Sequence, residues 1–222
     1  LKIGNYRVDD VYSIDRNGNR LQKNYTDSCV FDKKVTIGGK ECFVYSCYAG
    51  GQKVYEMPLY LDGSKLLVYP FQWAYWTSLY EQQWGVDFPT KPGPDELWVL
   101  ADFEKDNWKG FEDKVVKNHP LKQGATIDLT VKYRGDKTGE TTVTIEGKTY
   151  DAITITTHFT IEGHTIIDGE RHDFSTDDVQ KYIYAYKAGP VLYTQMPFEV
   201  DYGFGPVSVP GEETETVRLH VE

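Results

Sequence analysis

Short segments in which apolar and polar residues alternate make up most of the chain. Alternation with a period of two is typical of β-strands, because successive side chains of a strand point to opposite faces of a sheet. Turn-forming pairs such as Asn17-Gly18, Gly38-Gly39 and Asp62-Gly63 separate these segments and favour tight hairpins. The pattern predicts strands over residues 6–14, 25–31, 41–48, 53–61, 65–69, 96–103, 125–133, 140–145, 148–161, 181–186, 191–195 and 214–221.

About a dozen short strands at regular spacing favour an antiparallel sheet over alternating strand and helix units. We therefore predict a mostly β fold in which a curved antiparallel sheet forms a half barrel or an open barrel. One or two short helices are expected to pack on the concave face of this sheet. Two glycine-containing segments, residues 135–139 and 162–163, are interpreted as turns between strands.

The stretch from residue 69 to residue 84 interrupts this rhythm and contains three of the five tryptophans. Four of its aromatic residues recur at helical spacing: Trp73, Trp76, Tyr80 and Trp84. They fall within a narrow arc at about 100° per residue, which predicts an amphipathic helix over residues 72–84. The preceding strand is not expected to continue through this stretch, because Pro70 removes a ladder donor.

The two halves of the chain share short sequence matches in the same order. Residues 1–4 resemble residues 121–124, residues 35–40 resemble residues 143–148, and a Met-Pro pair follows in each half. The chain is predicted to be a single domain, residues 1–222. Within it, the matches predict two repeats, 1–70 and 121–222, joined by the aromatic segment 71–120. Independent convergence is the alternative, because exposed hairpins tend to use the same turn residues.

The overall charge restricts the partners of the protein. The 222 residues carry a formal net charge of −10, and no cluster of Lys or Arg offsets it locally. Such a chain repels phosphate backbones, so nucleic acids and anionic membrane surfaces are excluded as partners. The sequence contains no run of about 18 apolar residues that could form a membrane-spanning helix.

The three cysteines, Cys29, Cys42 and Cys47, are an odd number and do not imply a disulfide framework. Cys42 and Cys47 lie five positions apart, which on one strand places them on opposite faces. They are therefore not expected to bridge each other. We interpret all three as inert, half-buried thiols, and a bridge from Cys29 to one of the others across neighbouring strands stays open.

One segment, residues 162–173, gathers side chains that can bind metal ions. His164, Asp168 and His172 are its candidate ligands. Their spacing matches no defined metal signature, so a solvated acidic hairpin is the favoured interpretation. Motifs for a catalytic nucleophile are also missing from the sequence. We therefore expect no cofactor and no catalytic residue, and a metal-dependent hydrolase is the third of our functional hypotheses.

The aromatic residues support three interpretations. As ordinary core residues, they would each bury roughly 150–250 Å². Around an unfilled hollow, they would bind a lipid or another apolar small molecule. As an exposed row beside Gln72, Gln82, Gln83 and Asp87, they would bind carbohydrate. The candidate ligand-binding residues are Trp73, Trp76, Tyr80, Trp84, Trp98 and Trp108.

Several short segments resemble uncharacterised secreted or lipid-anchored β-rich proteins of Gram-negative bacteria. They are Leu1-Lys-Ile-Gly-Asn-Tyr6, Trp98-Val-Leu-Ala-Asp-Phe103 with Trp108, Gly147-Lys-Thr-Tyr150 and Tyr186-Lys-Ala-Gly-Pro-Val191. The expected architecture is also similar to the half barrels that carry lipoproteins and lipids through the periplasm. The resemblance implies export to the periplasm or outer membrane, with a signal segment or N-terminal lipid anchor lost upstream of Leu1.

Together these features predict a non-enzymatic envelope protein that binds an apolar ligand or another envelope protein. A carbohydrate-binding module that uses an exposed aromatic row is the alternative. A deep cavity beside the tryptophans would favour the first hypothesis, and a flat exposed row of aromatic rings would favour the second.

Overall fold

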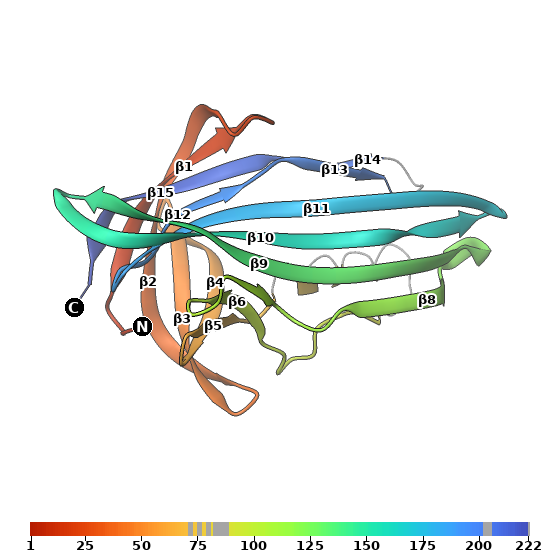
Figure 1. Cartoon of the computed structure of the whole chain (residues 1–222), viewed down its shortest axis with the longest axis horizontal. Helices are drawn as coiled ribbons and strands as arrows, with labels where there is room; N and C mark the ends of the chain where they lie inside the picture. The colour runs from red at the N-terminus through yellow and green to blue at the C-terminus, as the bar shows by residue number, and fades with distance from the viewer. Residues whose placement is uncertain (71–72, 75–76, 79–80, 82–88, 202–205, 222) are drawn as a thin grey trace.

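A computed structural model describes residues 1–70, 73–74, 77–78, 81, 89–201 and 206–221 (Figure 1). The strands are β1 (Tyr6–Ile14), β2 (Arg20–Ile37), β3 (Lys40–Ala49), β4 (Gln52–Asp62), β5 (Lys65–Val68), β6 (Trp98–Asp102), β7 (Asn107–Lys109), β8 (Lys114–Pro120), β9 (Thr126–Ile145), β10 (Lys148–Ile167), β11 (Glu170–Ala185), β12 (Gly189–Gln195), β13 (Phe198–Asp201), β14 (Pro206–Val209) and β15 (Gly211–His220). A short 3-10 turn, η1 (Lys122–Gly124), precedes β9. The predicted mostly β fold is confirmed.

Thirteen strands form one antiparallel sheet in the order β6-β5-β4-β3-β2-β1-β15-β12-β11-β10-β9-β7, with β8 paired to β9. The first meander, β1 to β6, and the second, β9 to β12, are joined because β15 lies between β1 and β12 (Figure 1). At the two ends of this path, the amide of Val99 donates a 3.0 Å hydrogen bond to the carbonyl of Gly110, just after β7. The curved sheet therefore nearly closes into a barrel.

The long strands β9 and β10 correct two predicted turns. Residues 135–139 lie within β9, where the register shifts opposite Thr154 and Ile155, and residues 162–163 lie within β10. The glycines serve close packing here. A Cβ atom at Gly135 would overlap the indole of Trp108, and one at Gly163 would overlap the backbone at Asp128. Glycine in a strand can mark a close approach as well as a turn.

The hairpin turns do not decide whether the two halves are repeats. Gly38-Gly39 and Glu146-Gly147, which belong to matched segments, both have positive φ at each turn residue, as type I′ hairpins require. However, Gly50-Gly51 and Asp168-Gly169 share this conformation without belonging to the matched segments. The internal repeat therefore stays a prediction.

Only part of the predicted helix over residues 72–84 is described. Five of its residues are helical: Trp73, Ala74, Thr77, Ser78 and Glu81. The amide of Ala74 donates to the carbonyl of Pro70 at 2.9 Å. The other residues of that range lie outside the described residues, so the helix as a whole stays a prediction. In the part of the chain that the structure describes, no helix is both long and apolar enough to cross a membrane.

The cysteine interpretation was wrong for two of the three residues. Cys29 and Cys47 face each other directly across β2 and β3 and form a disulfide, with their Cα atoms 4.0 Å apart. Cys42 is free and buried. The spacing argument against a Cys42 bridge to Cys47 concerned a single strand, whereas the bridge depends on the register between two strands, which the sequence pattern does not determine.

Candidate ligand-binding cavity

The interior of the curved sheet contains a cavity of about 2160 Å³, lined by residues from both meanders and from β13, β14 and β15. Ligand pockets for small molecules are typically about 300–1,000 Å³. The cavity is therefore large enough for an extended chain rather than a single compact group.

Much of the cavity wall is aromatic and aliphatic. Trp98 lines the cavity, and its ring centroid lies 4.1 Å from that of Phe111 and 6.1 Å from that of Phe159. Trp73 also packs on Phe159, at 5.1 Å, and its indole N–H donates to the carbonyl of Thr90 at 2.8 Å. The aliphatic lining residues include Leu59, Leu66, Leu100, Ile127, Leu129 and Ile161.

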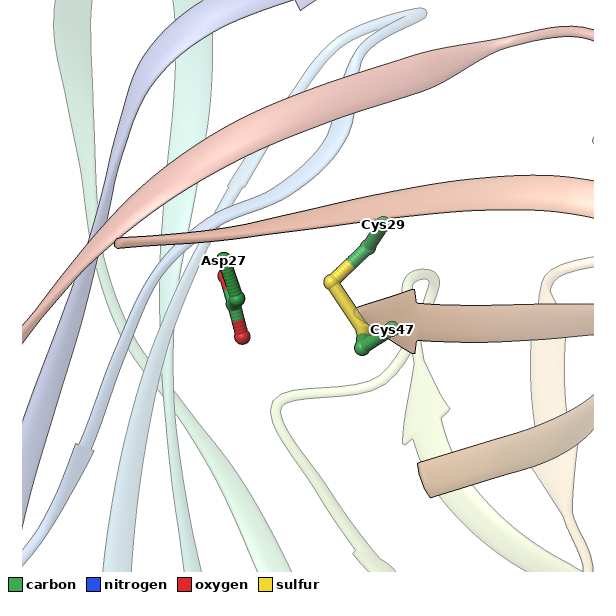
Figure 2. A group of neighbouring side chains, drawn as sticks. All are labelled: Asp27, Cys29 and Cys47. Atoms are coloured by element: carbon green, nitrogen blue, oxygen red, sulfur yellow. A yellow bond between two sulfur atoms is a disulfide. The ribbon is translucent and has the colours of Figure 1, made fainter. Parts of the chain in front are cut away.

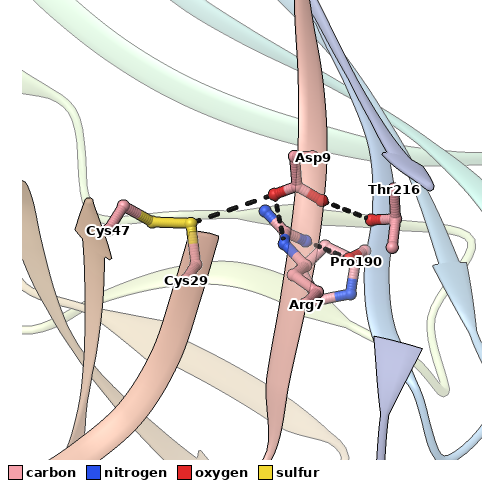
Figure 3. Close-up of a disulfide and its surroundings, with 6 residues drawn as sticks. All are labelled: Arg7, Asp9, Cys29, Cys47, Pro190 and Thr216. Carbon is pink, nitrogen blue, oxygen red and sulfur yellow. Dashed lines mark hydrogen bonds and ion pairs between the residues drawn. A yellow bond between two sulfur atoms is a disulfide. The ribbon is translucent and has the colours of Figure 1, made fainter. Parts of the chain in front are cut away.

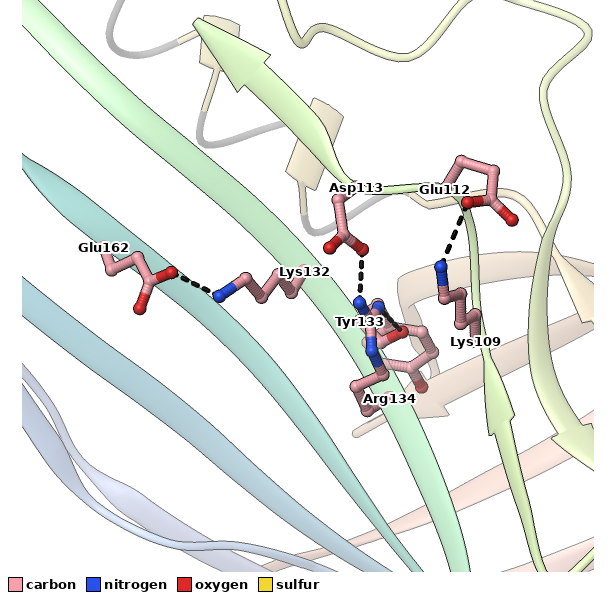
Figure 4. A network of polar contacts seen from close by, with 7 residues as sticks. All are labelled: Lys109, Glu112, Asp113, Lys132, Tyr133, Arg134 and Glu162. Carbon is pink, nitrogen blue, oxygen red and sulfur yellow. Dashed lines mark hydrogen bonds and ion pairs between the residues drawn. The ribbon is translucent and has the colours of Figure 1, made fainter.

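The inner and outer faces of β9 differ sharply. Tyr133 is buried and lines the cavity. Its neighbours Lys132 and Arg134 instead form ion pairs with Glu162 and Asp113 (Figure 4). This alternation along β9 places the apolar groups inside and the paired charges outside, as the period of a strand requires.

A first polar group in the cavity wall surrounds Asp9, which is fully buried on β1 (Figure 3). Nε of Arg7 lies 2.7 Å from its Oδ2, and the Thr216 hydroxyl donates to its Oδ1 at 2.7 Å. Arg7 also donates to the carbonyl of Pro190, and its guanidinium lies 5.0 Å from the ring centroid of Tyr45. The two charges of this pair thus compensate each other, although Nε of Arg7 makes no well-directed hydrogen bond within the described residues.

A second carboxyl group, that of Asp27, lies directly opposite Asp9 on β2 and near the disulfide (Figure 2). Asp27 is 8% exposed and lines the cavity. Its Oδ1 has no hydrogen-bond partner among the described residues. Burial and the adjacent negative charge of Asp9 raise its pKa to about 6.

A third polar group lines the cavity on β11 and β12. The side-chain amides of Gln180 and Gln195 donate to the two carboxylate oxygens of Asp178, at 2.7 and 3.2 Å. The hydroxyls of Tyr182 and Tyr193 donate in turn to these two glutamines, at 2.7 and 3.2 Å. Burial raises the pKa of Asp178 to about 6, although the two amides oppose this shift.

The structure places the predicted ligand-binding residues in different surroundings. Trp73 and Trp98 are buried and line the cavity. Trp108 is also buried, but it packs against Gly135. Trp76, Tyr80 and Trp84 lie outside the described residues, as do Gln72, Gln82, Gln83 and Asp87. The three described tryptophans therefore contribute to the interior and not to an exposed row.

The three candidate metal ligands do not converge. His164 faces Asp173, whereas His172 faces Thr165, so the histidines point to opposite faces of the sheet. Asp168 lies in the turn beyond them, with a φ of 53°. Among the described residues, Asp27, Cys29 and Cys47 do come together at metal-ligand distance. The sulfur atoms of Cys29 and Cys47 are joined in the disulfide, so the two cysteines cannot serve as thiolate ligands.

The sequence reasoning missed the carboxyl groups of the cavity, Asp9, Asp27 and Asp178. Asp9 and Asp178 each belong to a pair of adjacent acids, Asp9-Asp10 and Asp177-Asp178, and on a strand the two members of such a pair point to opposite faces. This alternation was the available signal, because one member of each pair must face the interior when the strand forms part of a barrel wall. It could not show which strands bring the inward carboxyl groups together.

The fold and the cavity define a class, that of antiparallel β proteins in which one large curved sheet surrounds a hollow interior. No model of a known protein family matches the chain, and no curated protein matches it. Similar solved structures include a candidate lipoprotein from Parabacteroides distasonis ATCC 8503, with 12% identity, a TM-score of 0.43 and coverage of 99% of this chain and 96% of that chain. Another is a candidate exported protein with a YmcC-like fold from Bacteroides fragilis NCTC 9343, with 10% identity, a TM-score of 0.41 and the same coverage. These likenesses are too distant to carry an argument about function.

Proposed function

We propose that this protein binds an elongated apolar or amphipathic molecule inside its curved sheet and catalyses no reaction on it. The observation that carries the proposal is the cavity of about 2160 Å³, whose wall is largely aromatic and aliphatic. A large apolar cavity with a few polar groups is the usual form of a small-molecule binding site.

We also propose that the protein acts in the bacterial envelope. The Cys29–Cys47 disulfide supports this location, because disulfides persist in oxidising compartments such as the periplasm and are rare in the cytosol. An apolar segment of another envelope protein is the competing occupant of the cavity.

Uptake of the apolar dye N-phenyl-1-naphthylamine tests the binding proposal. The wild-type protein is expected to enhance and blue-shift the fluorescence of the dye. Thr176→Trp adds a bulky ring at a buried position that lines the cavity, and it should weaken dye binding at least about tenfold, or by about 1.4 kcal/mol.

Ser175→Trp is the matched control, because Ser175 is the exposed neighbour on the same strand. It should bind the dye like wild type. Equal loss of binding in both variants, or no uptake by the wild-type protein, would contradict the proposal. Far-UV circular dichroism and a thermal melt establish that both variants are folded.

A further inference from the structure

We propose that the ligand carries a cationic head group, such as an ammonium, which pairs with Asp27 while its apolar chain fills the aromatic part of the cavity. This inference rests on the proposed binding function and names the chemical class of the ligand.

The unpaired oxygen of Asp27 is the first observation behind this inference. Buried polar groups are normally hydrogen-bonded, and a buried charge without a partner is costly. Asp27 is more than nine-tenths buried and lines the cavity, yet its Oδ1 has no partner among the described residues. A donor from a bound molecule would satisfy it.

The hydroxyl of Tyr45 is a second polar group in the same situation. It is buried in the cavity wall and also lacks a hydrogen-bond partner in the described part of the chain. The ring of Tyr45 lies 6.5 Å from that of Tyr55, at an interplanar angle of 69°. Tyrosine rings beside a carboxylate suit a cation, because the ring faces are negative, and the guanidinium of Arg7 already lies 5.0 Å from the centroid of Tyr45.

The balance of basic and acidic residues that line the cavity indicates the charge of the group that would pair with Asp27. The basic residues among the described lining are Arg7, Lys53 and Lys187, and the acidic residues outnumber them: Asp9, Asp27, Glu56, Glu104, Glu140, Asp151, Asp178 and Glu212. Arg7, the buried base, is engaged by Asp9 and by the carbonyl of Pro190. Asp27 is therefore left without a counter-charge of its own, and a cation fits this site better than an anion.

Displacement of N-phenyl-1-naphthylamine by three probes with the same twelve-carbon chain tests the inference at pH 7.5. The probes are dodecylamine, which is cationic, 1-dodecanol, which is neutral, and dodecanoate, which is anionic. We expect dodecylamine to bind at least about tenfold more tightly than dodecanoate, with 1-dodecanol in between.

Asp27→Asn should reduce this preference to within about threefold. Asp177→Asn is the matched control, since it removes the same charge from the exposed residue that hydrogen-bonds His158, and it should keep the full preference. This pair separates recognition at Asp27 from the general attraction of a cation to a protein of net charge −10.

Each outcome bears on one proposal. If all three probes bind equally, or if dodecanoate binds best, the cationic head group is wrong and the binding function stands. If Asp178→Asn abolishes the preference and Asp27→Asn does not, the assignment to Asp27 is overturned. If neither the dye nor any probe binds, the proposed function itself fails.

Discussion

Asp9 and Asp27 face each other across β1 and β2, yet their two carboxyl groups differ in their polar partners. Asp9 is fully buried, and Arg7 and Thr216 satisfy its two oxygens. Asp27 is almost as buried, but one of its oxygens has no partner among the described residues and its pKa is raised to about 6. Arg7 thus pairs directly with Asp9, and its nearby charge only partly opposes the rise in the pKa of Asp27.

The ion pairing of Asp9 and the unpaired oxygen of Asp27 indicate different roles for these two carboxyl groups of the cavity wall. A buried ion pair is costly to break, because the remaining charge is left without compensation. A buried carboxyl group without a counter-ion destabilises the folded state instead, and such groups are enriched at binding sites. We infer that Asp9 belongs to the scaffold and that Asp27 belongs to the ligand site.

Removal of Arg7 should produce the largest effect. Arg7→Met leaves the buried Asp9 unpaired, and we expect it to lower the free energy of unfolding by about 3–5 kcal/mol in a urea titration. The double variant Arg7→Met with Asp9→Asn should recover part of this loss, because it removes the uncompensated charge. A single variant that is as stable as wild type would show that Arg7 does not hold Asp9.

Removal of the disulfide should have the next largest effect. The Cys29→Ala, Cys47→Ala double variant opens a loop whose ends are 18 residues apart, and we expect a loss of about 3 kcal/mol in the same titration. Cys42→Ala is the control for the loss of a cysteine as such. A thiol assay on the denatured, unreduced wild-type protein should detect only the thiol of Cys42. Three reactive thiols would contradict the bridge.

Asp27→Asn should have a smaller effect of opposite sign. The folded pKa of Asp27 is raised from 3.8 to about 6, so the folded state holds a proton that the unfolded state has released between these pH values. The contribution of Asp27 to stability therefore falls as pH rises through this window, and the penalty persists above it.

The variant should consequently be more stable than wild type at pH 8, by about 1–2 kcal/mol, and the gain should vanish near pH 4. The difference between the two proteins is the quantity to measure, because Asp178 titrates in the same range. A variant less stable than wild type at pH 8 would mean that Asp27 has a partner in the folded protein.

The class of fold could be predicted from the sequence because strand alternation and turn residues are local signals. Gly38-Gly39 is an example, since it forms the turn between β2 and β3. Gly135 and Gly163 were misinterpreted because their role depends on a distant neighbour, Trp108 for one and Asp128 for the other. The sequence of a strand does not show which distant residues pack against it.

The candidate site could be predicted only in part. Trp73 and Trp98 were recognised from their aromatic character, and both line the cavity. The pairing of Cys29 with Cys47 and the meeting of Asp9 with Asp27 depend on strand register. Register is set by turns and by packing over the whole sheet, so it could not be obtained from the spacing of single residues.

Native mass spectrometry of the purified protein, before and after incubation with dodecylamine, tests the central claim most directly. The account predicts an added small-molecule mass that the folded protein carries and that disappears on denaturation. After incubation, the added mass should be that of dodecylamine. An unchanged mass in both folded samples, from protein with its disulfide intact, would contradict a ligand-binding interior.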